Sequence, residues 1–431
     1  MREMKDSGIE WIGEIPKEWK IDKIKYHLKR NEPKNHGNAI VLSVYRDYGV
    51  IPKDSRDDNH NVTSEDTSKY KYVKKGQLVI NKMKAWQGSL AVSDYNGIVS
   101  PAYFIYDFTD EEYNHKYFHY LVRNCYKEEF KRISGGIREG QWDLSPEAFA
   151  NTLALLPPLV EQKYIANYLD TQCSEIDAIA EDIQKEISLL EDYKKSVITE
   201  AVTKGLNPDA EMKDSGIAWI GEIPKDWDLL KIGYVTKEIS DIDHYMPSDS
   251  DDIDKVPYLM IGDLKENISQ IDFESCKYIS KKVYRALSIK SKPEKENVIF
   301  ARYATIGTVC FVDSEKQLLV SYACLTVKAN ELIKGRFLFY YFKSNAFLEE
   351  VSQYVKSNTQ GNIGKESLIR AKIVVPKLKE QTQIISYLDS KCSEIDAIIA
   401  DKKRQRGILA EYKKSLIYEY VTGKKEVPVH E

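Results

Sequence analysis

The sequence predicts an α+β protein that contains two similar mixed α/β globular units, each followed by a long helix. Residues 161–203 and 380–422 align without a gap at a shift of 219, which pairs Glu161 with Glu380. Residues 4–19 recur as 212–227 at a shift of 208. Because 431 residues are too many for one hydrophobic core, the chain is interpreted as a head-to-tail duplication. The expected ranges are 1–155 and 206–375 for the units, 156–205 and 376–424 for the helices, and 425–431 for a C-terminal tail.

The first long helix carries the seam of a coiled coil, because apolar residues follow one another at steps of seven from Leu169 to Val197. Neither Pro nor Gly interrupts residues 161–203, which predicts a continuous helix of about 65 Å at roughly 1.5 Å per residue. In the second copy Lys402 takes a seam position, where a polar residue usually specifies register. An alternative is a pair of ordinary amphipathic core helices. The expected seam residues are Ile165, Leu169, Ile176, Ile179, Ile183, Leu190, Val197, Ile384, Leu388, Ile395, Ile398, Leu409 and Leu416.

The composition is that of an ordinary folded protein, with 42% hydrophobic, 11% aromatic and 30% charged residues. The first residues contain no apolar run that could serve as a signal peptide, and no stretch of 18 apolar residues occurs. We therefore expect a cytoplasmic protein that does not span a membrane. The net charge of −4 arises mainly in residues 161–211, which carry 5 basic and 12 acidic side chains. Any affinity for DNA must then come from local patches or from a basic partner.

Cysteine and histidine give no metal site and no disulfide framework in the sequence. The six cysteines lie far apart without a CxxC pair, which indicates reduced thiols. His115 and His119 have the spacing of two ligands on one helix face, but no neighbouring Cys, Asp or further His completes a set. The sequence therefore predicts that the chain binds no metal.

The two units differ in content while keeping the same order of segments. Residues 76–92 and 296–311 are both typical of a strand, a polar and aromatic turn and a second strand. Each unit then has an aromatic segment with helical character, at 111–130 and 335–354, and a Gly-containing polar loop, at 134–142 and 356–364. Prolines next to a short apolar strand set the start of each long helix. The Asp-rich run 240–255 is expected to be a solvated loop, and the weaker alternatives are a nucleic-acid mimic or a cation site.

No catalytic constellation is present. The LPPL at 156–159 lacks the leading amide or carboxyl side chain of an amino-methyltransferase motif, and the carboxylates of PDAEMK at 208–213 lie too close together for a nuclease site. The chain also lacks a Walker-type phosphate loop, a dinucleotide fingerprint and a nucleophile elbow. We therefore predict no catalytic residues and expect the chain to bind and arrange other molecules.

The loops of the two units hold the residue types that read base edges or grip phosphates. Arg and Lys suit guanine, Asn and Gln suit adenine, and hydroxyl groups suit phosphate. Each residue alone is more often an ordinary surface residue, but the set lies on equivalent loops. The DNA-binding candidates are Lys82, Lys84, Trp86, Gln87, Arg138, Gln141 and Trp142 in the first unit, and Arg302, Tyr303, Thr305, Lys356, Asn358, Thr359, Gln360 and Asn362 in the second.

Taken together, these segments resemble the specificity subunit of type I restriction-modification systems over essentially the whole chain. The resemblance rests on the paired IGEIPKEW and IGEIPKDW segments, the INKMKAWQGSLAVS and FARYATIGTVCF loops, and the PPLVEQKYIANYLD and PKLKEQTQIISYLD helix starts with SEIDAI and YKKS downstream. It implies a non-enzymatic reader of double-stranded DNA with two target-recognition domains, held by two helices that pack antiparallel. Each domain would read one half of a bipartite, asymmetric site.

The resemblance also implies partners and cofactors. Two methyltransferase subunits that use AdoMet would dock on the helices, and two restriction subunits that translocate DNA with ATP would join them. No cofactor is expected on this chain itself, since AdoMet, ATP and Mg would bind to the partner subunits. Two equal halves with pseudo-two-fold symmetry match the dyad of duplex DNA. Lengthening or shortening both helices is therefore expected to change the gap between the half-sites and to leave their sequences unchanged.

Three competing interpretations stay open. The chain could be a scaffold with two binding modules that do not recognise DNA, or a cryptic enzyme in one globular unit. It could also be the reader of a related restriction system whose partner fuses cleavage and methylation. DNA binding that requires a methyltransferase partner separates the reader from the scaffold, and activity of the purified chain alone would reveal an enzyme.

Overall fold

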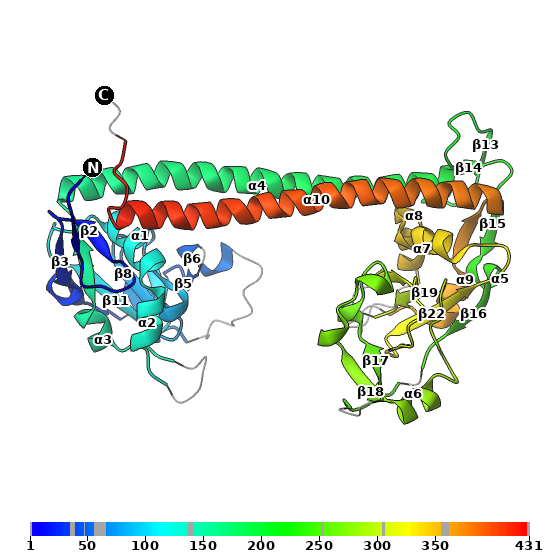
Figure 1. Ribbon diagram of the computed structural model, residues 1–431, viewed down its shortest axis with the longest axis horizontal. Coiled ribbons are helices and arrows are strands. Elements are labelled where there is room, and N and C mark those ends of the chain that lie inside the picture. The colour runs from blue at the N-terminus through cyan, green and yellow to red at the C-terminus, as the bar shows by residue number, and fades with distance from the viewer. Residues whose placement is uncertain are drawn as a thin grey trace. The chain divides into compact units, whose positions relative to one another are not determined.

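The computed structural model describes residues 2–34, 39–46, 48–55, 66–136, 142–242, 244–250, 254–303, 307–354 and 362–428, and its elements are shown in Figure 1. The chain forms two compact units, and each takes part of both long helices. Unit 1 comprises Met1–Ile183 and Arg404–Glu431, and unit 2 comprises Gln184–Lys403. The long helices are α4 (Leu159–Lys204) and α10 (Leu378–Val421), so both lie inside the ranges expected from the sequence.

The globular part of unit 1 is built mainly from short antiparallel strands. Its central sheet has the strand order β4-β11-β8-β9, and helix α1 packs beside β9. The strands are β1 (Met4–Asp6), β2 (Glu14–Pro16), β3 (Lys20–Lys23), β4 (Leu28–Arg30), β5 (Leu42–Tyr45), β6 (Gly49–Pro52), β7 (Lys71–Val73), β8 (Leu78–Asn81), β9 (Leu90–Val92), β10 (Gly97–Val99), β11 (Tyr103–Phe108) and β12 (Leu153–Leu156). The helices are α1 (His115–Cys125), α2 (Lys127–Ile133) and α3 (Pro146–Asn151), with 3-10 turns η1 (Ile24–Tyr26), η2 (Lys53–Ser55) and η3 (Ala85–Gln87).

Unit 2 repeats the central sheet in the order β16-β22-β19-β20 and covers it with α7. Its strands are β13 (Met212–Asp214), β14 (Glu222–Pro224), β15 (Asp228–Lys231), β16 (Thr236–Ser240), β17 (Lys255–Leu259), β18 (Lys277–Ser280), β19 (Val298–Ala301), β20 (Val309–Phe311), β21 (Leu319–Val320), β22 (Cys324–Ala329) and β23 (Lys372–Val375). Its helices are α5 (Ile232–Val235), α6 (Lys281–Leu287), α7 (Gly335–Lys343), α8 (Asn345–Ser352) and α9 (Lys365–Arg370), with 3-10 turns η4 (Ile261–Asp263), η5 (Ile268–Gln270) and η6 (Phe273–Ser275). The three-stranded sheet β18-β17-β21 is specific to this unit, whereas β5-β6 and β10-β7 are specific to unit 1.

The two halves of the repeat therefore share a frame and differ in what fills it. Strand β12 pairs with β3 in unit 1, and β23 pairs with β15 in unit 2, each directly before a long helix. The aromatic segments expected as single helices are divided into α1 and α2 and into α7 and α8. In unit 2 the division falls at Ser344, whose hydroxyl caps α8 by accepting the backbone N–H of Phe347 at 3.2 Å.

The long helices pack antiparallel within each unit. In unit 1 Asp177 pairs with Lys413, and the rings of Tyr168 and Tyr420 lie 4.6 Å apart. The later residue of α4 thus contacts the earlier residue of α10, as antiparallel packing requires. In unit 2 the same relation joins Asp396 to Lys194, at 2.7 Å. The two ion pairs are related by the shift of 219, so the repeat in the sequence extends to the contacts between the helices within each unit.

The buried seam differs from the prediction at two positions. Ile179 and Ile398 were expected in the seam, but they are 51% and 46% exposed. In the structure, the second buried residue of each heptad lies four residues after the first, as Ile187 lies after Ile183. Ile179 lies only three residues after Ile176. One residue corresponds to about 100° of rotation around a helix, which carries Ile179 out of the interface.

Most other predicted seam residues are buried. Leu190 and Leu409 are partly buried, and Lys402 forms an ion pair with Glu186 at its seam position. The buried members of the predicted set are Ile165, Leu169, Ile176, Ile183, Val197, Ile384, Leu388, Ile395 and Leu416. Both globular cores extend onto the helices. The core of unit 1 includes Leu169 and Leu416, and that of unit 2 includes Val197 and Leu388.

Candidate nucleic-acid interface

The turn between β8 and β9 gathers most of the candidate residues of unit 1. Lys82 donates to Asp143 at 2.7 Å, and the indole rings of Trp86 and Trp142 lie 5.6 Å apart. The backbone N–H of Leu144 also donates to the carbonyl oxygen of Lys82 at 3.0 Å. The structure therefore brings the described end of the polar loop 134–142, and the two residues after it, against this turn.

Unit 2 ties its two loops together in the same way. The backbone N–H of Ile363 donates to the carbonyl oxygen of Arg302 at 3.0 Å, and Tyr303 forms a bridge with Asn362. Both turns depend on a glycine at equivalent positions, Gly88 with a φ of 89° and Gly307 with a φ of 96°. A side chain at either position would be strained by the positive φ and would collide with Lys127 or Leu348 of the next helical segment.

A small polar cavity of about 160 Å³ adjoins the turn in unit 1. Lys84 and Gln87 line it together with Arg46, whose guanidinium donates to the Gln87 side-chain oxygen at 3.2 Å. Arg123 of α1 donates to the carbonyl oxygen of Arg46 and fixes its backbone. The sequence prediction missed Arg46 because it follows a different strand, β5, about forty residues before the turn. Its nearest signal in the sequence was the aromatic and basic run VYRDY at 44–48.

The candidate arginine of unit 2 is already engaged within the protein. Arg302 donates to Asp241 at 2.6 Å and lies over the ring of Tyr303 at 5.1 Å. Its side chain is 15% exposed. For Arg302 to bond to a DNA base, the base would have to replace Asp241 as hydrogen-bond acceptor. The bond from the Ile363 N–H to the Arg302 carbonyl oxygen and the contact with the Tyr303 ring would remain. Asn362 beside it has a buried side-chain oxygen without a hydrogen bond to any described residue.

Seven of the predicted DNA-binding residues lie outside the described residues. They are Arg138, Gln141, Thr305, Lys356, Asn358, Thr359 and Gln360. For these positions the sequence-based expectation stays a prediction.

In each unit one buried glutamine fixes the globular part to the long helix that follows it. The sequence prediction did not single out either glutamine. In unit 1 the Gln162 amide donates to the carbonyl oxygens of Glu112 and Pro157 and accepts the backbone N–H of Asn114. In unit 2 the Gln381 amide makes the same three bonds with Leu332, Pro376 and Lys334. Their only signal was the shared EQ at the two helix starts.

A cluster of charges fixes α4 and α10 to the globular part of unit 2. Lys194 of α4 contacts Asp396 of α10 and also Glu266, at 2.9 Å, and Lys343 of α7 donates to the same carboxylate. Burial raises the pKa of Glu266, but the two ammonium groups outweigh this effect and lower the pKa to about 2. Burial and the neighbouring Lys194 lower the pKa of Lys343, and the charge of Glu266 only partly offsets them.

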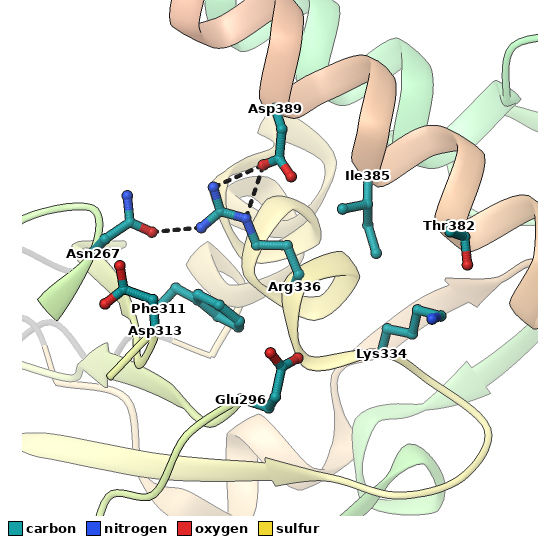
Figure 2. A pocket seen from close by; sticks show the side chains of 9 residues that line it. All are labelled: Asn267, Glu296, Phe311, Asp313, Lys334, Arg336, Thr382, Ile385 and Asp389. Carbon is teal, nitrogen blue, oxygen red and sulfur yellow. Dashed lines mark hydrogen bonds and ion pairs between the residues drawn. The ribbon is translucent and has the colours of Figure 1, made fainter. Parts of the chain in front are cut away.

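A cavity of about 540 Å³ in unit 2 looks at first like an anion site, because Arg336 lines it (Figure 2). However, the guanidinium donates to Asp389 at 2.8 Å and to the side-chain oxygen of Asn267 at 2.6 Å. It also lies over the rings of Phe311 and Phe339. Arg336 is therefore committed to holding α7 against α10, which favours a structural role.

The remaining candidates of the sequence have ordinary structural surroundings. Burial, and secondarily Arg123, lowers the pKa of His119 to about 3, so this imidazole is neutral and accepts the backbone N–H of Val92. His115 stacks on Phe108 at 4.1 Å. The six cysteines are buried as free thiols. Among the described residues no helix is long and apolar enough to pass through a bilayer.

The repeated frame, with a polar loop pair in each unit and a shared helix pair, defines a two-domain recognition protein. The sequence profile of the type I restriction modification DNA specificity domain matches residues 16–189 and again 224–405. The chain therefore belongs to the family of type I restriction-modification specificity subunits, with one target-recognition domain in each unit.

Relatives and solved structures agree with this assignment. The type I restriction enzyme MjaVIII specificity subunit of Methanocaldococcus jannaschii is 25% identical over 96% of this chain and 94% of its own length. The putative MjaX specificity subunit of the same organism is 24% identical over 96% of both chains. A chain from a structural study of the complex assembly and conformational transition of the type I R-M system shares the fold, with a TM-score of 0.67 at 14% identity, over 95% of this chain and 99% of that one.

Proposed function

We propose that this chain is the non-catalytic DNA-recognition subunit of a type I restriction-modification complex. It reads a bipartite, asymmetric site in double-stranded DNA, and each unit reads one half. The observation that carries the proposal is a backbone hydrogen bond between two loops that recurs in both units. It joins Leu144 to Lys82 in unit 1 and Ile363 to Arg302 in unit 2, and different side chains surround it in each unit. A common backbone arrangement that carries different side chains would allow the two units to read two different half-sites.

Within unit 1, we assign DNA contact to the turn after β8 and the cavity beside it. Lys84 and Arg46 supply cations, Gln87 supplies an amide that can bond to an adenine edge, and Trp86 with Trp142 supplies an apolar surface. Few charges gather there, in agreement with the small net charge of the chain. Tight binding therefore depends on phosphate contacts made by partner subunits.

The helix pair presents two equivalent apolar surfaces that suit two copies of one partner. In unit 1, Ile179 of α4 and both Ile408 and Tyr412 of α10 are exposed, within one to two turns of the ion pair between Asp177 and Lys413. In unit 2 the surface consists of the residues that the shift of 219 relates to these: Ile398, Leu189 and Tyr193. Large exposed apolar residues that recur in this way mark an interaction surface.

We propose that each of these surfaces docks one methyltransferase subunit, and that two restriction subunits complete the complex. Replacing Tyr412 and Ile408 together with Ser is expected to leave a complex with one methyltransferase subunit, since the surface in unit 2 is intact. The mass of the purified complex measures this stoichiometry. Two bound methyltransferase subunits after the substitution would show that docking uses another surface.

The DNA-reading proposal is tested by expressing the chain with its methyltransferase partner in a host without adenine methylation. Mapping modified adenines by single-molecule sequencing is expected to give a bipartite motif with a constant gap. Exchanging one globular unit for that of a relative should then change one half of the motif and leave the other. A contiguous motif, or methylation that does not depend on this chain, would contradict the proposal and favour a scaffold role.

A further inference from the structure

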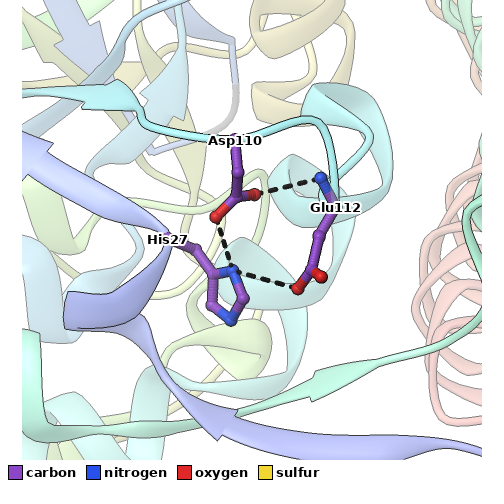
Figure 3. A group of neighbouring side chains, drawn as sticks. All are labelled: His27, Asp110 and Glu112. Carbon is purple, nitrogen blue, oxygen red and sulfur yellow. Dashed lines mark hydrogen bonds and ion pairs between the residues drawn. The ribbon is translucent and has the colours of Figure 1, made fainter.

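A histidine in unit 1 lies among three carboxylates at the point where the globular part meets α4. His27 follows η1 and its side chain is only 4% exposed. Its Nδ1 atom lies 3.0 Å from a carboxylate oxygen of Asp110 and 3.7 Å from one of Glu112 (Figure 3). On the other side of the ring, Nε2 lies 3.4 Å from a carboxylate oxygen of Asp22.

This arrangement leaves a neutral imidazole with an unfavourable contact in either tautomer. A neutral ring carries one N–H, so one of its nitrogens always presents a lone pair to a carboxylate. In the arrangement of the structure, Nε2 is buried and makes no hydrogen bond with favourable geometry to any described residue. A buried polar atom without a partner is unfavourable, and a cation bound to one ring nitrogen would leave the other as an N–H donor.

We propose that His27, Asp110 and Glu112 bind one divalent transition-metal ion of the zinc class. The three potential ligand atoms lie within 4.8 Å of one another, and Asp110 and Glu112 are exposed enough to rotate onto an ion. Imidazole nitrogen and carboxylate oxygen are both zinc ligands, and three protein ligands leave the fourth position of a tetrahedral site to water. With the metal on Nδ1, the Nε2–H group would donate to Asp22, which is the usual carboxylate partner of a metal-binding histidine.

The second unit shows that the fold does not need these residues. In both units the same Asx turn forms: Asp110 accepts the backbone N–H of Glu112 at 3.0 Å, and Asn330 accepts that of Leu332 at 2.9 Å. The glutamine clamp bonds to the carbonyl oxygens of Glu112 and Leu332 alike.

The histidine is replaced as well, because the shift of 208 that relates the unit starts pairs His27 with Val235. Val235 is buried, and its carbonyl oxygen accepts the N–H of Asn330, one position further along the turn than Thr109, whose N–H donates to the carbonyl oxygen of His27. All three proposed ligands are therefore absent from a loop of the same construction, which favours a binding role over a packing role.

Bound metal would act as a clamp at the domain junction. Glu112 supplies its side chain to the proposed ion and its carbonyl oxygen to Gln162 of α4 at 2.8 Å. The ion would thus connect η1, the loop before α1 and the start of α4. This inference does not depend on DNA recognition, and its test needs no DNA.

The test measures Zn²⁺ binding to the chelator-stripped full chain by competition with a chromophoric indicator, and Co²⁺ binding by visible absorption. The wild-type chain is expected to bind one equivalent, with a Co²⁺ spectrum free of thiolate charge transfer. His27→Val and Asp110→Asn copy unit 2, so the fold accommodates them, and each is expected to weaken binding about 100-fold or more. Glu111→Gln removes a neighbouring carboxylate outside the cluster and should bind like the wild type.

Two results would overturn the proposal. One is a wild-type chain that binds no Zn²⁺ or Co²⁺. The other is equal binding by the wild type and both variants, which would place the ion elsewhere, for example on a thiol. Circular dichroism of each variant excludes misfolding as the cause of lost binding.

Discussion

Glu266 is the group whose removal should weaken unit 2 most selectively. Its carboxylate neutralises Lys194 and Lys343, which are 10% and 18% exposed, and Lys194 also pairs with Asp396. Replacing it with Gln keeps the size and removes the charge. A pKa lowered from 4.5 to about 2 corresponds to about 3.4 kcal/mol at roughly 1.36 kcal/mol per unit. Because the Glu266 side chain is 40% exposed, screening by water reduces the expected loss to roughly 2 kcal/mol.

Hydrogen exchange followed by mass spectrometry measures this loss locally. Peptides from α7 and from the end of α4 that contains Lys194 are expected to exchange about 30-fold faster in Glu266→Gln, since about 1.4 kcal/mol is a factor of ten. Peptides from unit 1 serve as an internal reference. The control is Asp177→Asn, which removes the carboxylate partner of Lys413, the unit 1 counterpart of Lys194. Because Asp177 is 64% exposed, its loss should cost under about 1 kcal/mol.

The dependence on pH gives the sharper criterion. The folded-state pKa of Glu266 is depressed, so its contribution is fully present above about pH 4.5 and is lost as the pH falls through about 2. The difference between the wild type and Glu266→Gln should therefore shrink by roughly a third between about pH 5 and about pH 3.5. A difference that does not change with pH, or equal effects of the two substitutions, would refute the assignment of this stabilisation to the Glu266 charge.

Three further predictions concern the helix starts and the turn of unit 1. Gln381→Ala removes the partner of one buried and two partly buried backbone groups and is expected to cost about 2 to 4 kcal/mol, measured by thermal unfolding. Burial raises the pKa of Glu380, with a smaller contribution from Asp226, so its neutral form is favoured and unit 2 should gain stability as the pH falls toward that pKa. Glu380→Gln should remove that pH dependence in hydrogen exchange. Arg46→Ala is expected to weaken DNA binding by the complex, and it reduces the slope of log K against log salt by about one if Arg46 contacts a phosphate.

The repeat and its helices were predictable because the patterns that reveal them lie within continuous stretches of the sequence. A gapless match and a heptad pattern need no knowledge of the fold, and the seam residues Leu169 and Leu388 are buried as expected. The heptad pattern alone does not decide whether the second seam position follows by three or by four residues. That choice depends on how the partner helix packs, and for this reason Ile179 and Ile398 were assigned to the wrong face.

The site was less predictable because its parts are distant in the sequence. The turn after β8 could be found from its residue types, but Arg46 joins it only through the fold. The proposed metal ligands His27 and Asp110 are 83 positions apart and have no motif spacing, so the sequence indicated no metal site. Gln162 and Gln381 resembled ordinary polar residues at helix starts, because their role depends on complete burial.

The division of both long helices between the units has a consequence for how the protein is made. The core of unit 1 includes Leu416, Ile417, Tyr420 and Val421, which are translated after every residue of unit 2. While the chain emerges from the ribosome, the first unit therefore stays incomplete, although domains generally fold in the order of synthesis. A premature stop just after residue 403 would spare every residue of the second unit and leave the first without the end of its core. Unit 1 is thus encoded by two segments that lie on either side of the segment encoding unit 2.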